Sequence, residues 1–186
     1  MSSCRRTSTR PSGARNAGRR LEDLSVTGAA EADAAALAAL HCLVAQDLTR
    51  LHGRGHWSYE TTERGVLRAI TTARVLVVRR NAAIVGTLQL QTKKPWAIDR
   101  TYFTEVPRPL YLTAMAVHPS MQRRGIGRYL LQEACSAARE WPAQAIRLDA
   151  YDAEAGAGPF YAKCGFREAG RVIYRGTPLI YYEWLL

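Results

Sequence analysis

Hydrophobic and polar positions along the chain predict alternating strands and helices from about residue 21 to the C-terminus. The apolar, β-branched runs 74–78 and 83–91 flank a short turn at Asn81 and predict a hairpin. An Ala- and Leu-rich segment with few helix breakers predicts a helix from about Glu31. The expected order is β-α-α-β-β-β-α-β-α-β-β, with strands at 21–26, 74–78, 83–91, 110–117, 145–151, 167–176 and 177–186 and helices near 31–48, 59–73, 127–140 and 155–166.

This order predicts an α/β (α+β) layer fold on a mixed sheet, in a single domain over residues 21–186. The segment 110–117 alternates poorly between apolar and polar residues, which is typical of a strand buried on both faces. The segment 92–109 is aromatic, irregular and marked by prolines, so we expect a loop that lies near the substrate.

The formal net charge of +10 arises largely in the first 20 residues. Six arginines and no acid lie there, so residues 21–186 hold 20 basic residues against all 16 acids, a net charge of about +4. The segment 1–20 has almost nothing apolar to bury, and we expect a disordered basic tail. It is either a simple flexible extension or a non-specific contact for acidic partners; no specific nucleic-acid site is expected.

Hydropathy and cysteine spacing indicate a soluble protein of the cytoplasm. No apolar run approaches the ~20 residues of a membrane span, and the N-terminus lacks the apolar core of a signal peptide. The four cysteines, Cys4, Cys42, Cys135 and Cys164, are scattered and form neither a CxxC pair nor a metal cluster. We therefore expect reduced thiols, a cytoplasmic location, no membrane contact and no bound metal.

The stretch 115–134, MAVHPSMQRRGIGRYLLQEA, joins the end of an apolar strand to a helix through a basic loop with two glycines. It lacks the Gly-Lys-Ser/Thr of a P-loop, and Leu130 stands where a dinucleotide fingerprint needs its third glycine. Free N–H groups and the helix dipole attract anions to such a helix start, and glycine lets them approach. Two interpretations remain: a pyrophosphate-binding loop, to which the basic side chains add donors, or a tight turn before a core helix.

Two blocks of the sequence together resemble the motifs of the GNAT superfamily of acyl-CoA-dependent N-acyltransferases. Residues 122–127, QRRGIG, fit the family's Q/R-x-x-G-x-G/A signature, and residues 159–171, PFYAKCGFREAGR, are similar to its later motif of an aromatic pair, a short helix and Gly-Phe. Both stand in the family's order, and the resemblance spans about 24–186. It implies a mixed, largely antiparallel sheet of about six to seven strands with helices on both faces, and an N-acetyltransferase that uses acetyl-CoA as co-substrate.

The resemblance also assigns roles to individual residues. The strand before the loop would hold the pantetheine arm of the coenzyme, and the residues expected there are Met115, Ala116 and Val117. The loop would bind the pyrophosphate through Gln122, Arg123, Arg124, Gly125, Ile126, Gly127 and Arg128. Glu154 stands where the family often has an asparagine that contacts the coenzyme, so that contact is not carried over.

Tyr161 falls on the family's tyrosine near the coenzyme sulfur. Acyl transfer from a thioester to an amine expels a thiolate, and we expect the Tyr161 phenol to be the nearby proton donor that assists its departure. The alternative is a hydroxyl that only hydrogen-bonds in a half-buried core.

The attacking amine must be neutral, so a general base or a water chain is needed. The acids near the expected site are Asp99, Glu105, Asp149 and Asp152, and the sequence does not choose among them. No Ser-His-Asp or Cys-His arrangement is visible, so we expect direct transfer in a ternary complex without a covalent enzyme intermediate.

The acceptor amine is the least defined part of the expected reaction. Aromatic residues of the two irregular loops line either an amine pocket or the edge of the core; they are Trp57, Tyr59, Trp96, Tyr102 and Phe103. The net positive charge argues against strongly cationic acceptors such as polyamines. We expect a primary amine of a small molecule; the alternatives are a protein N-terminus or lysine, or a non-catalytic acyl-CoA sensor. A homodimer is compatible with the family, but no local feature decides it.

Overall fold

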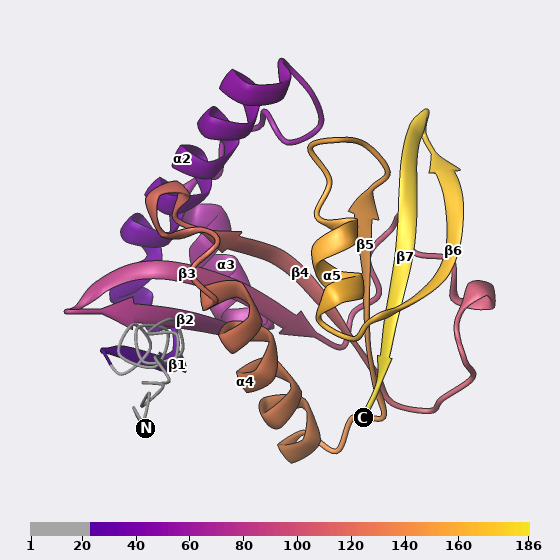
Figure 1. Ribbon diagram of the computed structural model, residues 1–186. Coiled ribbons are helices and arrows are strands. Elements are labelled where there is room, and N and C mark those ends of the chain that lie inside the picture. The colour runs from indigo at the N-terminus through magenta and orange to yellow at the C-terminus, as the bar shows by residue number, and fades with distance from the viewer. Residues whose placement is uncertain (1–22) are drawn as a thin grey trace, which may run out of the picture.

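Seven strands form one sheet in residues 23–186, the part of the chain that the computed structural model describes (Figure 1). The strands are β1 (Leu24–Gly28), β2 (Arg74–Arg80), β3 (Ala83–Gln91), β4 (Pro109–Val117), β5 (Ala145–Tyr151), β6 (Arg167–Tyr174) and β7 (Thr177–Leu185). The helices are α2 (Ala34–His52), α3 (Glu63–Thr72), α4 (Ile126–Glu140) and α5 (Gly158–Lys163), with 3-10 turns η1 (Glu31–Asp33), η2 (Arg100–Tyr102) and η3 (Pro119–Met121). The order of strands and longer helices is the predicted one, and the predicted α/β class is confirmed.

Both faces of the first half of the sheet are buried. In β2, Val75 and Val77 pack with α2 and α3, whereas Leu76 and Val78 pack with α4 on the opposite face. Successive residues of a strand point to opposite faces, so a strand covered on both sides reads as a continuous apolar run. This accounts for the run 74–78 and for the helices on both faces.

The sheet order is β1-β2-β3-β4-β5-β7-β6, and every neighbouring pair is antiparallel except β4 and β5. These two strands pair in parallel over three positions only, Pro109–Tyr111 against Ala145–Arg147. Beyond them β4 continues along β3 and β5 continues along β7, so the two strands diverge (Figure 1). We call this divergence, between 112–117 of β4 and 148–151 of β5, the splay.

β4 carries a bulge beside the splay. Thr87 pairs with Ala116 and Gln89 pairs with Thr113, so β4 has one residue more than β3 between these pairs. Ala114 takes a left-handed φ of 48° at this point, as an extra residue in a bulge can. Residues 110–112 are buried, with Leu110 and Leu112 on one face and Tyr111 on the other, as predicted for a strand covered on both sides. Residues 113–115 are only half-buried, so the prediction fails for the part of the strand that carries the bulge.

The segment 92–108 packs on the second half of the sheet. Ile98 and Phe103 are buried against Tyr111 and Tyr181, on the face opposite to the core beneath α5. Much of this segment is therefore a cover for the sheet, and not only the substrate loop that its composition suggested.

A buried ion pair fixes this cover. Arg147 and Glu183 are 2% and 1% exposed, and the Arg147 Nε donates to Glu183 Oε1 at 3.1 Å. Arg147 also donates to the backbone carbonyl of Thr104, whose hydroxyl donates to Glu183 Oε2 at 2.7 Å. Arg167 adds a contact of 2.9 Å to the same oxygen. Burial acts to raise the pKa of Glu183, but the hydrogen bonds from Thr104, Arg167 and Arg147 together lower it.

The predicted tail, the predicted lack of a membrane-spanning helix and the cysteines can be compared with the structure in turn. The basic tail expected over residues 1–20 lies outside the described residues, as does Cys4. Between residues 23 and 186, no helix has both the length and the apolar character needed to cross a bilayer. Cys42, Cys135 and Cys164 are free thiols.

Replacing Glu183 by alanine should lower the free energy of unfolding by about 3–5 kcal/mol, because it leaves the buried Arg147 guanidinium without its counterion. Denaturant titration followed by circular dichroism measures the loss. Asp152→Ala is the control, since it removes a partner of the exposed Arg171 and should cost about 1 kcal/mol or less. Equal losses in the two variants would show that the buried pair has no special weight.

Candidate active site

The loop between β4 and α4 presents free backbone donors. The first N–H group of α4 with a backbone acceptor belongs to Tyr129, which donates to the Gly125 carbonyl at 3.0 Å. The six preceding N–H groups, of residues 123–128, have no acceptor among residues 23–186. Gly125 precedes the helix with a φ of 87°, a left-handed conformation that glycine adopts without strain. Six free donors at the positive end of a helix dipole form a site for an anion.

The side chains of this loop divide into two groups. Arg123 and Arg124 are exposed, and they add positive charge beside the free N–H groups. Gln122 and Arg128 are used within the protein: Gln122 Nε2 donates to the Val117 carbonyl at 3.2 Å, and Arg128 donates to the Lys163 carbonyl at 3.0 Å. Arg128 therefore ties the start of α4 to the end of α5.

Only the backbone of Ile126 faces the loop, because its side chain is buried in the core. Gly127 lies against α5: a Cβ placed there would come within 3.0 Å of the Phe160 ring. This close approach explains why the second glycine of the loop has no side chain. It also brings the two sequence motifs, which lie more than 30 residues apart, into direct contact.

The end of β4 directs backbone groups toward the splay. His118 donates its N–H to the Val85 carbonyl of β3 at 2.9 Å. Successive residues of an antiparallel pair alternate in direction, so the backbone groups of Val117 point away from β3. The contact from Gln122 to the Val117 carbonyl agrees with this orientation. Met115 and Val117 flank Ala116, which pairs with Thr87 of β3 and is buried.

Tyr161 lies on α5 and is 7% exposed. Its hydroxyl donates to the Met115 Sδ of β4 at 3.7 Å, so the phenol points across to the strand that borders the splay. Burial, then the negative charge of Asp149, then Cys164 raise the pKa of Tyr161 far above the usual value. The hydroxyl therefore keeps its proton at neutral pH.

Only one of the four candidate acids combines partial burial with a position at the splay. Asp149 is half-buried on β5, two residues beyond the last β4–β5 pair, and burial raises the pKa of its carboxyl. A carboxylate that holds a proton more readily than usual is suited to accepting one.

The other three acids are exposed or already engaged. Asp99 accepts hydrogen bonds from Thr101, which lower its pKa, and Asp152 pairs with Arg171 at 2.8 Å. Glu105 is exposed in the segment 92–108. The structure thus distinguishes Asp149, which the sequence could not.

The loop between α2 and α3 reaches across to the second half of the sheet. His56 Nε2 and the Thr177 hydroxyl of β7 are 2.6 Å apart. The His56 ring stacks on Tyr151 at a centroid distance of 6.0 Å, and Trp57 meets the same tyrosine edge-on at 5.8 Å. We call His56, Trp57, Tyr151 and Thr177 the cap. Trp57 was among the predicted aromatic residues, but its partners were not. No local pattern of the sequence can link His56 to Thr177, which are 121 positions apart.

The predicted aromatic residues do not gather in one place. Trp57 belongs to the cap, and Tyr59 is 62% exposed in the same loop. Tyr102 and Phe103 instead pack on Tyr181, with ring centroids 5.5 and 5.3 Å apart. Trp96 is 84% exposed. The aromatic lining near the splay therefore comes from the α2–α3 loop and β5.

In the part of the chain that the structure describes, no three His, Cys, Asp or Glu side chains gather closely enough to hold a metal ion. The arrangement at the splay consists of an anion-binding loop, a protonated phenol and a half-buried carboxylate. These are the components of acyl transfer assisted by proton donors and acceptors.

Comparison with known proteins identifies the class. The sequence model of the Acetyltransferase (GNAT) family matches residues 39–166, more than half of the chain, and the protein belongs to this family. It is thus an acyl-CoA-dependent N-acyltransferase, and the prediction of the family is confirmed. A search of curated protein sequences finds no match.

Solved structures of the same fold cover nearly the whole described chain. PaiA N-acetyltransferase from Thermoplasma acidophilum, in complex with coenzyme A, has a TM-score of 0.68 at 15% identity, over 88% of this chain and 99% of that one. YncA from Salmonella typhimurium, a putative acetyltransferase with acetyl-CoA, has a TM-score of 0.64 at 19% identity, over 89% and 95%. Ribosomal-protein-alanine N-acetyltransferase from Brucella melitensis has a TM-score of 0.66 at 21% identity, over 87% and 99%.

Gly125→Glu should raise the Kd for coenzyme A at least tenfold, about 1.4 kcal/mol. The added carboxylate would stand beside the free N–H groups and repel the pyrophosphate. Isothermal titration calorimetry measures this Kd. Gly176→Glu is a matched control, because Gly176 also has a positive φ (81°) but lies in the β6–β7 turn. An unchanged Kd in Gly125→Glu would contradict the assignment of the loop.

Proposed function

We propose that the protein is an N-acetyltransferase that acetylates a primary amine of a small molecule, by direct attack of the amine within a ternary complex. The observation that carries the proposal is the splay, which is bordered on β4 by Met115, the acceptor of the Tyr161 hydroxyl, and on β5 by Asp149, while the free N–H groups of residues 123–128 follow the end of β4. Donor binding and proton transfer would thus be served from one point in the fold.

The residues of β4 and of the loop that follows it fit acetyl-CoA as the acetyl donor. The N–H groups of 123–128, with Arg123 and Arg124, would hold the pyrophosphate, and the backbone of Met115 and Val117 would pair with the pantetheine amides like an added strand. Acetyl-CoA supplies the activated acetyl group as a thioester. Arg128 would act mainly through its backbone, since its side chain is bonded to Lys163.

Tyr161 would assist departure of the thiolate. Its hydroxyl already donates to a sulfur atom, that of Met115, which borders the splay. Because burial holds the pKa of this phenol well above that of a thiol, donation of a hydrogen bond to the leaving sulfur is favoured over complete loss of the proton.

Asp149 would take the proton from the amine. Burial raises the pKa of its carboxyl, which makes the ionised carboxylate a better base than that of an exposed aspartate. This role is consistent with transfer in a single step, without a covalent intermediate on the protein.

The cap supports a small acceptor. The His56–Thr177 contact and the packing of Trp57 on Tyr151 tie the α2–α3 loop to β5 and β7, on the approach to Asp149. A loop held this way leaves less room for a folded protein than for a small amine, and its aromatic rings favour an apolar substituent. The protein-acceptor alternative draws support from the fold shared with ribosomal-protein-alanine N-acetyltransferase.

We infer a reducing compartment, the cytoplasm, for this reaction. The three cysteines between residues 23 and 186 are free thiols, which is the usual state in the cytosol. The homodimer stays a prediction.

A panel of acceptors tests the proposed substrate class through the release of free coenzyme A thiol. Arylalkyl primary amines should give kcat/KM at least tenfold above peptides that end in a free alanine amine or carry a free lysine. Faster turnover of either peptide would contradict the small-molecule proposal. If the protein binds acetyl-CoA but no acceptor causes release of free coenzyme A, the result would favour a non-catalytic acyl-CoA sensor.

Asp149→Asn and Tyr161→Phe should separate the two proton roles. In the wild type, kcat/KM should fall as the pH drops through the pKa of Asp149, because a protonated carboxyl cannot accept a proton. The raised pKa puts this fall above the usual carboxyl range. Asp149→Asn should lower kcat on the order of 10²-fold and remove the fall, whereas Tyr161→Phe should lower kcat by a similar factor, keep the fall and leave KM nearly unchanged.

Two controls accompany these variants. Thermal unfolding should show that Asp149→Asn is at least as stable as the wild type at neutral pH. The reason is that a raised folded-state pKa means that the ionised carboxylate is disfavoured in the fold. Tyr174→Phe, on β6, should match the wild type in kcat. A Tyr161→Phe variant as fast as the wild type would reduce Tyr161 to a packing role.

A further inference from the structure

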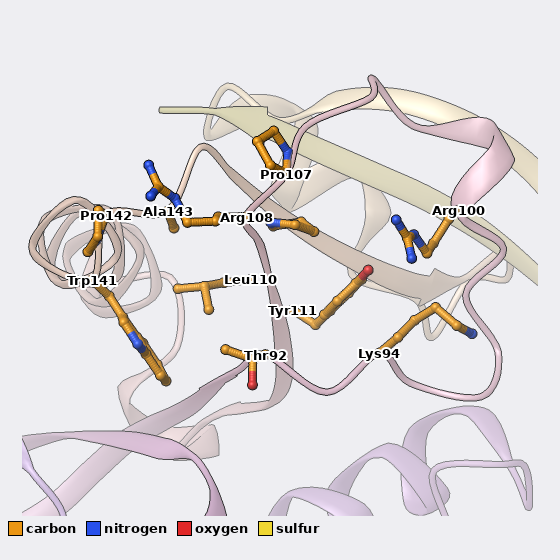
Figure 2. Close-up of a pocket in the computed structure, with 11 residues that line it drawn as sticks. Thr92, Lys94, Arg100, Pro107, Arg108, Leu110, Tyr111, Trp141, Pro142 and Ala143 are labelled. Atoms are coloured by element: carbon orange, nitrogen blue, oxygen red, sulfur yellow. The ribbon is translucent and has the colours of Figure 1, made fainter.

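A second concave site lies at the opposite end of β4 from the donor loop. It is a groove of about 560 Å³, lined among others by Lys94, Arg100, Arg108, Leu110, Tyr111 and Trp141 (Figure 2). The start of β4, Pro109, lines the groove, whereas its end, Val117, precedes the donor loop. Eight residue steps of about 3.3 Å separate these points, roughly 25 Å along the strand. The groove is therefore distinct from the site of acetyl transfer.

The groove gathers positive charge. Lys94, Arg100 and Arg108 line it, and none of the described residues that line it is acidic. Asp99, which precedes Arg100, accepts hydrogen bonds from Thr101 and its charge acts on Lys94, but it forms no ion pair with Arg100. An anion bound beside Arg100 would add the ion pair that this guanidinium lacks.

The fold holds the ammonium group of Lys94 in place. The Lys94 Nζ donates to the carbonyls of Pro95 and Ile98 at 3.0 and 2.6 Å, which leaves one of its three N–H groups for a ligand. The backbone of Arg108, at the other side of the groove, is fixed by Gln144 at 3.2 and 3.0 Å. A donor that is already positioned loses less entropy when it binds.

One wall of the groove is apolar. Leu110 and Trp141 line it, and the Trp141 side chain is 38% exposed at the end of α4. Figure 2 shows Trp141 at one side of the groove and Lys94 and Arg100 at the other, with the Tyr111 hydroxyl directed toward Arg100. The groove thus has an aromatic end and a cationic end.

We propose that this groove binds an aromatic phosphate, such as a nucleotide, with its planar group at Trp141 and its phosphate between Lys94 and Arg100, which lie at the same side of the groove (Figure 2). A phosphate dianion matches two cations better than a carboxylate, which carries one charge, and guanidinium groups bind phosphate oxygens in pairs. The volume is within the 300–1,000 Å³ range of small-molecule sites. This site is independent of the proposed acceptor.

Calorimetric titration with AMP, on protein saturated with coenzyme A, tests the proposal. The saturating coenzyme blocks the donor loop, so that only a second site is measured. We expect saturable binding with one AMP per chain. Arg100→Ala should weaken it at least tenfold, and Trp141→Ala should weaken it at least threefold. Arg139→Ala is the matched control, because Arg139 is exposed on the last turn of α4 but does not line the groove.

Each outcome decides part of the proposal. Absence of saturable AMP binding would overturn it, as would equal affinity in Arg100→Ala and the control. Inorganic phosphate should bind more weakly than AMP; equal affinity for the two would overturn the role of Trp141. Coenzyme A affinity, measured separately, should be unchanged in all variants, and a loss there would indicate damage to the fold.

Discussion

The short parallel contact between β4 and β5 is the constraint on which the rest of the molecule depends. Two strands that pair over three positions and then diverge leave backbone donors and acceptors without partners on their inner edges. Unpaired backbone groups are costly when buried, so the opening must be filled by water, side chains or an extended ligand. The bulge at Ala114 turns the end of β4 further from regular pairing. The donor loop, Tyr161 and Asp149 all border this opening.

A sheet joined by so few pairs needs other links between its halves. On one face these links come from the helices: Gly127 packs on Phe160, and Arg128 bonds the last turn of α5. On the other face, the segment 92–108 is fixed to β5 and β7 by the buried Arg147–Glu183 pair. The cap adds a third link, from the α2–α3 loop to β7. The opening is therefore held from several sides and does not depend on β-pairing alone.

The sequence was sufficient for the order of the elements and for the two motifs, because both depend on local patterns. Apolar runs bounded by turns define the strands, and the glycine loop and PFYAKCGF each lie within one short segment. The sequence could not show which of the four acids is the best candidate base. Asp149 is distinguished by its burial and by its position just beyond the β4–β5 contact. The same holds for the His56–Thr177 contact and for the use of Arg128, since each joins residues that are distant in the chain. The bulge in β4 could not be predicted either, because it depends on the pairing with β3, and residues 113–115 are less buried than the apolar run indicated.

The splay also divides the surroundings of the reaction into two compartments. Its α4 and α5 side carries the donor loop and the core around Tyr161, while its other side faces α2 and the cap. For the proposed reaction this gives donor and acceptor separate routes to a shared opening. Neither then has to wait for the other to enter or leave, so a ternary complex can assemble in random order. Loop rearrangements on one side can change which amine is accepted while the machinery for the donor stays the same.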